Sequence, residues 1–341
     1  MQIKRRSLLR AAIALIGASL CSPVVAEQKL NWFSPRANSD GSWFFNVESV
    51  FLSADRDAGI NSFALNDGGG VTYGPITQTL GSEEFTGSPR VSIGRLSASG
   101  WGVQLNWWEF TSGNSIGFAG LPATAITTPD LGIYAETART RAYALDLELL
   151  KRFCFQNSTV LVNAGIRQGR INHLDSATAI GFTDEGDFHT LNARSEVGFE
   201  GTGFTYGMQA QRNTAGPVSL FASGRLSHLF GQNEASASTS AMGSGPSGFT
   251  NAASAAVSEL DESLFIAETQ FGAIWQRQLK STGGRMFAKI GFEFQYWNSP
   301  DLPATSANFA SFAGSRTDVA STANDLQTRF LGLVLGAGYA W

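Results

Sequence analysis

Several otherwise apolar segments of this sequence have charged and other polar side chains on alternate positions. In the segment 286–297, Lys289 and Glu293 share one face, and the opposite face is aliphatic and aromatic. This alternation is typical of a β-strand with one polar and one apolar face. If the apolar face meets lipid, the ionised face must lie inside a closed barrel, because lipid cannot satisfy charges. We predict ten interior residues: Glu48, Arg90, Gln104, Asp146, Glu148, Arg167, Arg225, Glu268, Lys289 and Glu293.

Two roles fit these ten side chains. They could line a water-filled pore and tune the passage of ions, and their mixed signs would then give no strong selectivity. They could instead pair into salt bridges that fill a narrow barrel, because the lumen widens with strand number and small barrels are filled by side chains. The sequence leaves both roles open, and we take the pore-lining role as the prediction.

A catalytic role was considered for the polar stretch around 171–193. It contains His173 and His189, together with the aspartates Asp175, Asp184 and Asp187. Paired Asp and His residues could support a barrel protease by acid and base catalysis. Sequence spacing does not show that these groups converge, and polar loops are common in barrels. We therefore predict that the protein is not an enzyme.

No metal, nucleotide or other cofactor site is predicted. Asp55 and Asp57 begin a pattern that resembles a calcium loop, but its later ligands are missing. The Gly201-Thr-Gly203 piece lies in a strand and not before a helix, so it does not indicate nucleotide binding. Cys154 is the only cysteine after a predicted signal peptide, so neither an internal disulfide nor a cysteine metal site is expected.

The last segment of the chain has the features of a membrane-spanning strand. From Leu331 to Trp341, large apolar residues alternate with glycine and other small residues, and the chain ends on an aromatic residue. A transmembrane barrel pairs its last strand with its first and so has no open edge. We predict that Tyr339 and Trp341 form the signal that the barrel-assembly machinery recognises.

The first residues have the features of a secretion signal. Lys4, Arg5, Arg6 and Arg10 precede the short apolar run 8–20, and Val24-Val25-Ala26 fits a cleavage site. We predict a signal peptide over 1–26, a periplasmic lead-in over 27–42, and a barrel over 43–341. Without residues 1–26, 20 basic and 28 acidic residues remain, a net charge of −8. No basic patch indicates nucleic acid as a partner.

The segments between these ends alternate apolar and polar residues in about ten places, with short turns and long loops between them in strict alternation. The long loops are predicted over about 54–88, 111–138, 171–193, 231–262 and 298–325, and the fourth is expected to be mobile. An even strand count puts both termini in the periplasm and the long loops outside the cell. The predicted fold is an all-β transmembrane antiparallel up-and-down barrel of about 10 strands. Two weak strands in the first loop would make 12.

Several segments together resemble the Legionella major outer membrane protein-like family of pore-forming outer-membrane proteins. They are Ser88–Gly94, Gly102–Trp108, Leu145–Leu149, Gly165–Arg167, Phe199–Gly203, Gly224–Gly231 and Gly291–Trp297. The sequence departs from the family pattern at Gln209, where an acidic residue is expected, and at His228, where an apolar one is expected. The resemblance implies an outer-membrane barrel with porin-like activity, and it brings no catalytic residues.

The predicted function is a channel in the bacterial outer membrane for passive diffusion of ions and small solutes. Its expected partners are the lipid bilayer, the barrel-assembly machinery and small solutes, and the sequence leaves the oligomeric state unknown. The alternative is a closed barrel that acts through its long extracellular loops.

Overall fold

The computed structural model describes residues 42–56, 60–66, 72–77, 85–119, 131–182, 188–214, 216–245, 248–279, 283–300, 302–312, 315–323 and 326–341. The regular elements among them are all β-strands, as the alternating sequence predicts. None of the described residues forms a helix long and apolar enough to cross a membrane. The predicted signal peptide, and the lead-in up to residue 41, lie outside the described residues.

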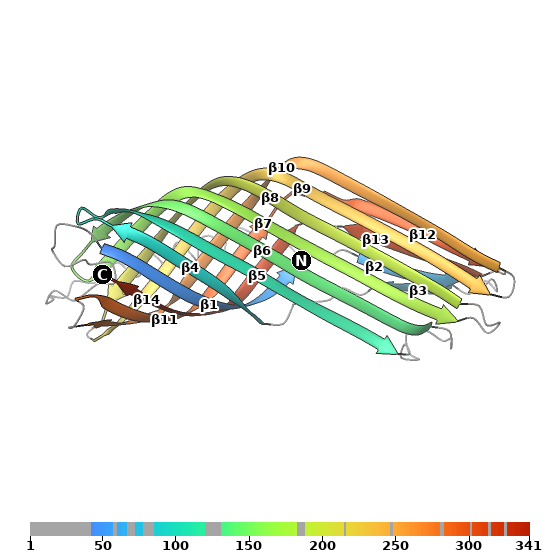
Figure 1. Ribbon diagram of the computed structural model, residues 1–341, viewed down its shortest axis with the longest axis horizontal. Coiled ribbons are helices and arrows are strands. Elements are labelled where there is room, and N and C mark those ends of the chain that lie inside the picture. Colours follow the sequence, from blue (N-terminus) through green and yellow to red (C-terminus); the bar gives the residue numbers. More distant parts are fainter. Residues whose placement is uncertain are drawn as a thin grey trace.

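Ten strands form a closed antiparallel barrel (Figure 1). In barrel order they are β1 (Ser42–Arg56), β14 (Gln327–Ala340), β11 (Arg285–Asn298), β10 (Gly248–Gln278), β9 (Val218–Gly245), β8 (Phe188–Asn213), β7 (Ser158–Phe182), β6 (Leu131–Cys154), β5 (Trp101–Ala119) and β4 (Thr86–Leu96). The barrel closes where β1 pairs with β14 from Phe44 opposite Ala340 to Arg56 opposite Thr328. The first strand begins at Ser42, one residue before the predicted boundary.

The outer face of the barrel is apolar, and its inner side chains are buried. In β1 buried and exposed residues alternate almost throughout, and exposed Phe45, Val47 and Phe51 face away from the lumen. The last strand follows the prediction, with Leu331, Leu333 and Leu335 all exposed on the outside. Such an apolar outer surface on a barrel fits a lipid environment.

Short connections lie at the end of the barrel where β1 begins and β14 ends. One of them is the turn 97–100, which Gly100 closes with a φ of +83°. A side chain there would be strained by the backbone conformation and would lie 2.9 Å from the Arg152 carbonyl oxygen. The turns between β6 and β7 and between β8 and β9 lie at the same end. In outer-membrane barrels this is the periplasmic end.

The predicted long loops around 111–138, 171–193 and 231–262 are wrong for most of their residues, because the strands continue through them. β5 to β10 contain 19 to 31 residues, whereas β1, β4, β11 and β14 contain 11 to 15. Figure 1 shows the six long strands leaving the barrel as a curved sheet. Outside the membrane a strand needs no lipid-facing apolar residues. The outer parts of these strands instead alternate Ala with Ser or Thr, and this small, polar composition is also typical of loops.

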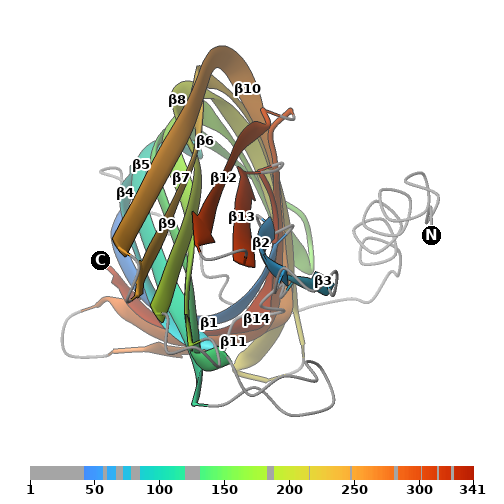
Figure 2. The same cartoon turned by 90° about the vertical axis from the view of Figure 1, so that its right-hand side faces the viewer.

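The other two predicted loops contain a second sheet. Its strands are β12 (Ala304–Phe312), β13 (Ser315–Ala323), β2 (Ile60–Asn66) and β3 (Thr72–Thr77), in that order. The first loop therefore contains two strands, as the alternative prediction held, but neither joins the barrel. Figure 2 looks along the long axis and shows β12, β13 and β2 inside the wall of long strands.

The four-stranded sheet packs against the inner face of β7 to β10. Val319 of β13 is buried with Leu191 of β8 and Ala241 of β9 in one apolar cluster. Hydroxyl groups add a polar contact, since Ser306 of β12 lies 2.7 Å from Ser254 and 3.1 Å from Thr239. The extracellular part is therefore a two-layered β-sandwich that continues from the barrel wall.

The contact between the two layers gives a testable prediction. Val319→Asp places an unpaired carboxylate among apolar residues, and we expect it to detach the four-stranded sheet while the barrel stays folded. Limited proteolysis should then cut within 299–326, and the barrel should keep its heat-dependent gel shift. Thr305→Asp, on the exposed face of β12, is the matched control, and equal protease resistance of V319D would contradict the packing role.

Candidate functional site

The barrel interior is divided into layers that can be followed along β1. Phe44 lies nearest the periplasm, followed by Asn46 and Glu48, and then by Val50 and Leu52. All five side chains are buried. The charged layer therefore lies between two apolar ones.

One half of the charged layer connects β1, β4 and β11. Arg90 donates two hydrogen bonds to the Glu293 carboxylate, at 2.6 and 2.9 Å, and a third to Glu48 at 3.2 Å. Lys289 Nζ lies 2.7 Å from both Glu48 and Gln270. Such bidentate arginine pairs are among the stronger hydrogen-bonded contacts in proteins. The contacts of Arg90 with Glu293 and of Lys289 with Glu48 join strands that are not neighbours in the sheet.

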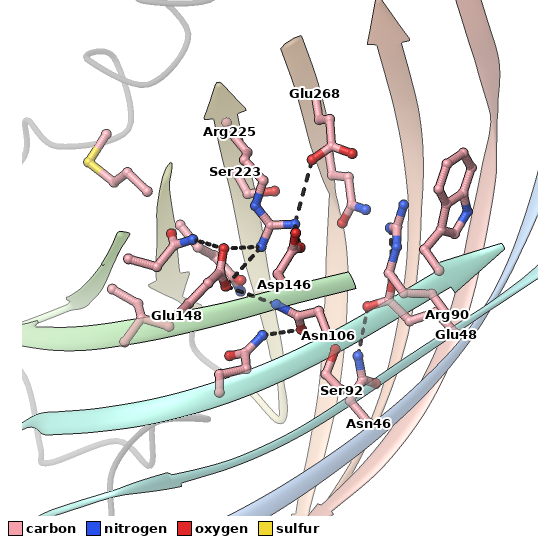
Figure 3. Close-up of a pocket in the computed structure, with 18 of the residues that line it drawn as sticks. Asn46, Glu48, Arg90, Ser92, Asn106, Asp146, Glu148, Ser223, Arg225 and Glu268 are labelled. Carbon is pink, nitrogen blue, oxygen red and sulfur yellow. Dashed lines mark hydrogen bonds and ion pairs between the residues drawn. The ribbon is translucent and has the colours of Figure 1, made fainter. Parts of the chain in front are cut away.

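The other half connects β6, β7, β9 and β10. Arg167 binds Asp146 through Nε at 2.5 Å and Nη2 at 2.9 Å, and its Nη2 also donates to Glu268 at 3.1 Å. Arg225 lies between Asp146, Glu148 and Glu268 at 3.1 to 3.5 Å (Figure 3). The side-chain amides of Asn106 and Asn163 also donate hydrogen bonds to the Glu148 carboxylate, at 2.8 and 2.6 Å.

A small pocket lies within this layer. Its volume is about 140 Å³, close to that of a cavity that holds a benzene-sized molecule. The pocket is lined by five carboxylates and four cationic side chains, so with every group ionised its wall carries one excess negative charge: Glu48, Asp146, Glu148, Glu268 and Glu293 against Arg90, Arg167, Arg225 and Lys289. Most of these side chains are buried, and Arg225 is the most exposed at 24%.

An aromatic layer covers the pocket on the extracellular side. Trp108, Phe110, Trp297 and Phe330 pack with ring centroids 5.0 to 6.3 Å apart, and each is at most 3% exposed. They belong to one continuous apolar cluster with members on nine of the ten barrel strands, all except β4. This cluster occupies the lumen between the charged layer and the β-sandwich.

Glycines on the inner face of β14 make room for the bulky lumen side chains. A Cβ on Gly338 would lie 2.0 Å from the Phe287 ring, and one on Gly336 would lie 3.0 Å from Glu48 Cγ. Phe287 and Phe44 line the pocket from the periplasmic side. The small residues of the last strand thus leave room in the lumen for large side chains of the two neighbouring strands, β1 and β11.

The structure brings all ten of the residues predicted for the lumen to this one pocket. That they line a conducting pore stays a prediction. The alternation that places Gln104 inward also places Trp108 inward, but it does not reveal the aromatic layer to which Trp108 belongs. The signal was a large apolar residue on the polar face of a strand, which also occurs at Phe330.

His173 and Asp175 both point inward, but they have different partners. His173 lies between Thr140 Oγ1, 3.1 Å from Nδ1, and Thr328 Oγ1, 2.7 Å from Nε2. Asp175 forms a buried ion pair with Arg56. Asp184 and Asp187 lie outside the described residues. Among the described residues, no group of three or more His, Cys, Asp or Glu side chains could hold a metal ion.

The two terminal aromatic residues lie at the seam of the barrel. The Tyr339 and Trp341 rings stack at 5.6 Å. The Trp341 backbone exchanges two hydrogen bonds with Trp43, at 2.9 and 3.0 Å. Their recognition by the assembly machinery stays a prediction. His228, where the family pattern has an apolar residue, is exposed, and its ring centroid lies 4.5 Å from that of Phe230.

Residues 95–336 match a protein-family model described as the Legionella pneumophila major outer membrane protein precursor. The chain belongs to this family. The match and the closed barrel together place the protein in the bacterial outer membrane. The family membership confirms the resemblance noted in the sequence.

Two solved structures that resemble this chain do so at low sequence identity. The outer membrane protease OmpT of Escherichia coli is 10% identical, with 88% of this chain and 97% of that chain covered and a TM-score of 0.40. A Pseudomonas aeruginosa FadL homologue is 10% identical, with 89% and 90% covered and a TM-score of 0.24. Neither likeness bears on the activity of this chain. No curated protein matches it significantly.

The charged layer gives a prediction about stability. Arg90→Gln leaves the buried Glu48 and Glu293 carboxylates without their shared cation, so we expect the free energy of unfolding to fall by about 3–5 kcal/mol. The matched control is Arg170→Gln, since Arg170 forms an exposed ion pair with Glu200 and should contribute at most about 1 kcal/mol. Urea titration of the folded barrel measures both changes. Equal losses of stability in the two variants would show that the buried ion pairs of Arg90 contribute no more than an exposed pair.

His173 gives a prediction about pH. It lies level with Arg329 and Asp55, whose exposed ion pair is beyond the apolar band. Burial, and next the charge of Arg56, hold its pKa well below 6.5. Below about pH 6.5 the His173 imidazole therefore binds a proton in the unfolded chain but stays neutral in the folded chain. The free energy of unfolding then falls as the pH drops, by up to about 1.4 kcal/mol per pH unit.

The difference between wild type and His173→Gln isolates this effect from the other titrating groups. Urea unfolding at pH 7, 6 and 5 should show a steeper loss of stability in the wild type than in the variant. Parallel losses in the two proteins would exclude a contribution from His173.

Proposed function

We propose that this protein is a closed outer-membrane barrel that acts through the β-sandwich it carries outside the cell. The observation that supports this most strongly is the apolar cluster in the lumen, which draws on nine of the ten barrel strands and contains four aromatic rings. Water and ions cannot cross such a layer without displacing it, because apolar side chains offer no partners for a hydrated ion.

The cost of opening the lumen supports the same function. Moving the aromatic side chains into water would forfeit about 25 cal/mol for each Å² of apolar surface exposed. Below them, a solute would also have to separate buried ion pairs such as Arg90 with Glu293 and Arg167 with Asp146. Breaking buried pairs of this kind is strongly unfavourable. We therefore propose that the lumen is structural.

The extracellular part has features of a contact surface. Phe249 and Val257 of β10 are 62% and 66% exposed, although they lie beyond the barrel. β10 pairs with β9 from Gly248 but with β11 only from Phe265, so residues 248–264 form a sheet edge among the described strands. Exposed apolar residues and free edges are used for protein recognition. The partner we propose is a protein on a neighbouring surface.

A second candidate is the channel predicted from the sequence. It is favoured by the pocket of about 140 Å³, which all ten predicted lumen residues line. The excess negative charge of that wall would favour cations over anions. This channel would conduct only when the aromatic layer is displaced.

A planar bilayer recording separates the two candidates. Refolded wild-type residues 27–341 should give a folded, heat-modifiable barrel without discrete current steps. Trp108→Ala combined with Phe330→Ala opens the aromatic layer and should give brief, small steps that favour cations. Phe271→Ala on the outer face is the control for side-chain truncation and should stay silent. Regular current steps from the wild type would overturn the closed-barrel proposal and support the channel.

A further inference from the structure

Three arginines lie together on the outer surface of β6 and β7. Arg139 and Arg141 are both exposed and two residues apart in β6, so they share one face of the sheet. Arg170 of β7 is opposite Tyr143, which is the next outward residue of β6 after Arg141. Diagonal neighbours of this kind lie about 7–8 Å apart, within the reach of two long side chains.

These arginines begin where the apolar outer band ends. In β6 the outward residues are Leu149 and Leu147, then Leu145 and Tyr143, and then the two arginines. In β7 the outward Val162 and Ile166 give way to Gln168 and Arg170. Since the turns at the other end face the periplasm, the arginines lie at the boundary with the outer leaflet. An aromatic residue beside cations is typical of a lipid headgroup region.

The charges of this cluster are only partly neutralised by the protein. Arg170 lies 3.7 Å from Glu200, and both side chains are more than half exposed, so the pair is weak. No ion pair to Arg139 or Arg141 is found among the described residues. At the periplasmic boundary, by contrast, Arg95 lies over the Trp43 ring and Lys151 over the Trp101 ring, at 5.7 and 4.6 Å. The outer cluster therefore has cationic groups available to an external anion.

We propose that Arg139, Arg141 and Arg170 bind the phosphate groups of outer-leaflet lipids. The guanidinium group binds phosphate through two parallel hydrogen bonds, and several such groups on a rigid sheet favour a lipid that carries more than one phosphate. The lipid chains would lie along Leu147 and Ile166, which are on the same outer face and nearer the periplasm than the cluster. This contact holds the protein at a fixed depth and does not depend on whether the lumen conducts.

The test is a titration of the folded chain in neutral detergent micelles with lipid A that carries two phosphates. Each arginine near an anionic surface contributes about fivefold in affinity, so Arg139→Gln combined with Arg141→Gln should weaken binding about 30-fold. Arg194→Gln is the matched control, because Arg194 is an exposed arginine on the same sheet that already pairs with Glu196 at 3.0 Å. It should change the affinity less than twofold.

Two further probes identify the source of the phosphate. Lipid A from which both phosphates have been removed should bind the wild type at least as weakly as intact lipid A binds the double variant, which keeps Arg170. Inorganic phosphate at millimolar concentration should not displace the lipid. Equal affinity of wild type and double variant for intact lipid A would overturn the proposal, as would equal wild-type affinity for the two lipids. Displacement by inorganic phosphate would assign the cluster to a soluble anion instead.

Discussion

The absence of water in the lipid core is the constraint on which the rest of this structure depends. Every backbone N–H and C=O group there must be paired within the protein, so the sheet has to close on itself. The closure is made by the register of β1 on β14, from Phe44 opposite Ala340 to Arg56 opposite Thr328. The backbone of Trp341 extends that register by one residue through its two hydrogen bonds to Trp43. Closure also fixes which side chains point inward.

A ten-stranded barrel is narrow, and this explains why the inward side chains meet. Arg90 of β4 reaches Glu293 of β11, and Arg167 of β7 reaches Glu268 of β10, so side chains from strands three places apart in the barrel are in direct contact. Ionised groups in such a space must be paired, since an unpaired buried charge is costly. The aromatic layer above them excludes water and thereby strengthens the electrostatic attraction below it. The lumen is thus a packed core with an ionic centre.

Outside the membrane the same constraint no longer applies, and the architecture changes accordingly. Six strands continue as an open sheet because water can pair the free edge of β10. The inner face of this sheet still carries small apolar residues such as Ala177 and Ala241, and these need cover. The four-stranded sheet of β12, β13, β2 and β3, which is formed by segments of the other two predicted loops, provides this cover. The two ends of the barrel therefore have different structures: the periplasmic end has tight turns, and the other end continues into the β-sandwich.

The sequence by itself determined the strand character, the membrane-facing side and the identity of the lumen residues, because each depends on the alternation of neighbouring residues. This is why Glu48 and Lys289, which are far apart in sequence, could both be placed inside. It also determined the family, through short segments spread along the chain.

Only the tertiary structure decided which of those residues pair, because partners such as Arg167 and Glu268 come from strands that are not adjacent. It also decided that β5 to β10 continue beyond the membrane. In that region Ala, Ser and Thr alternate as they do in a polar loop, and their strand conformation depends on the neighbouring strands and on the sheet that covers them.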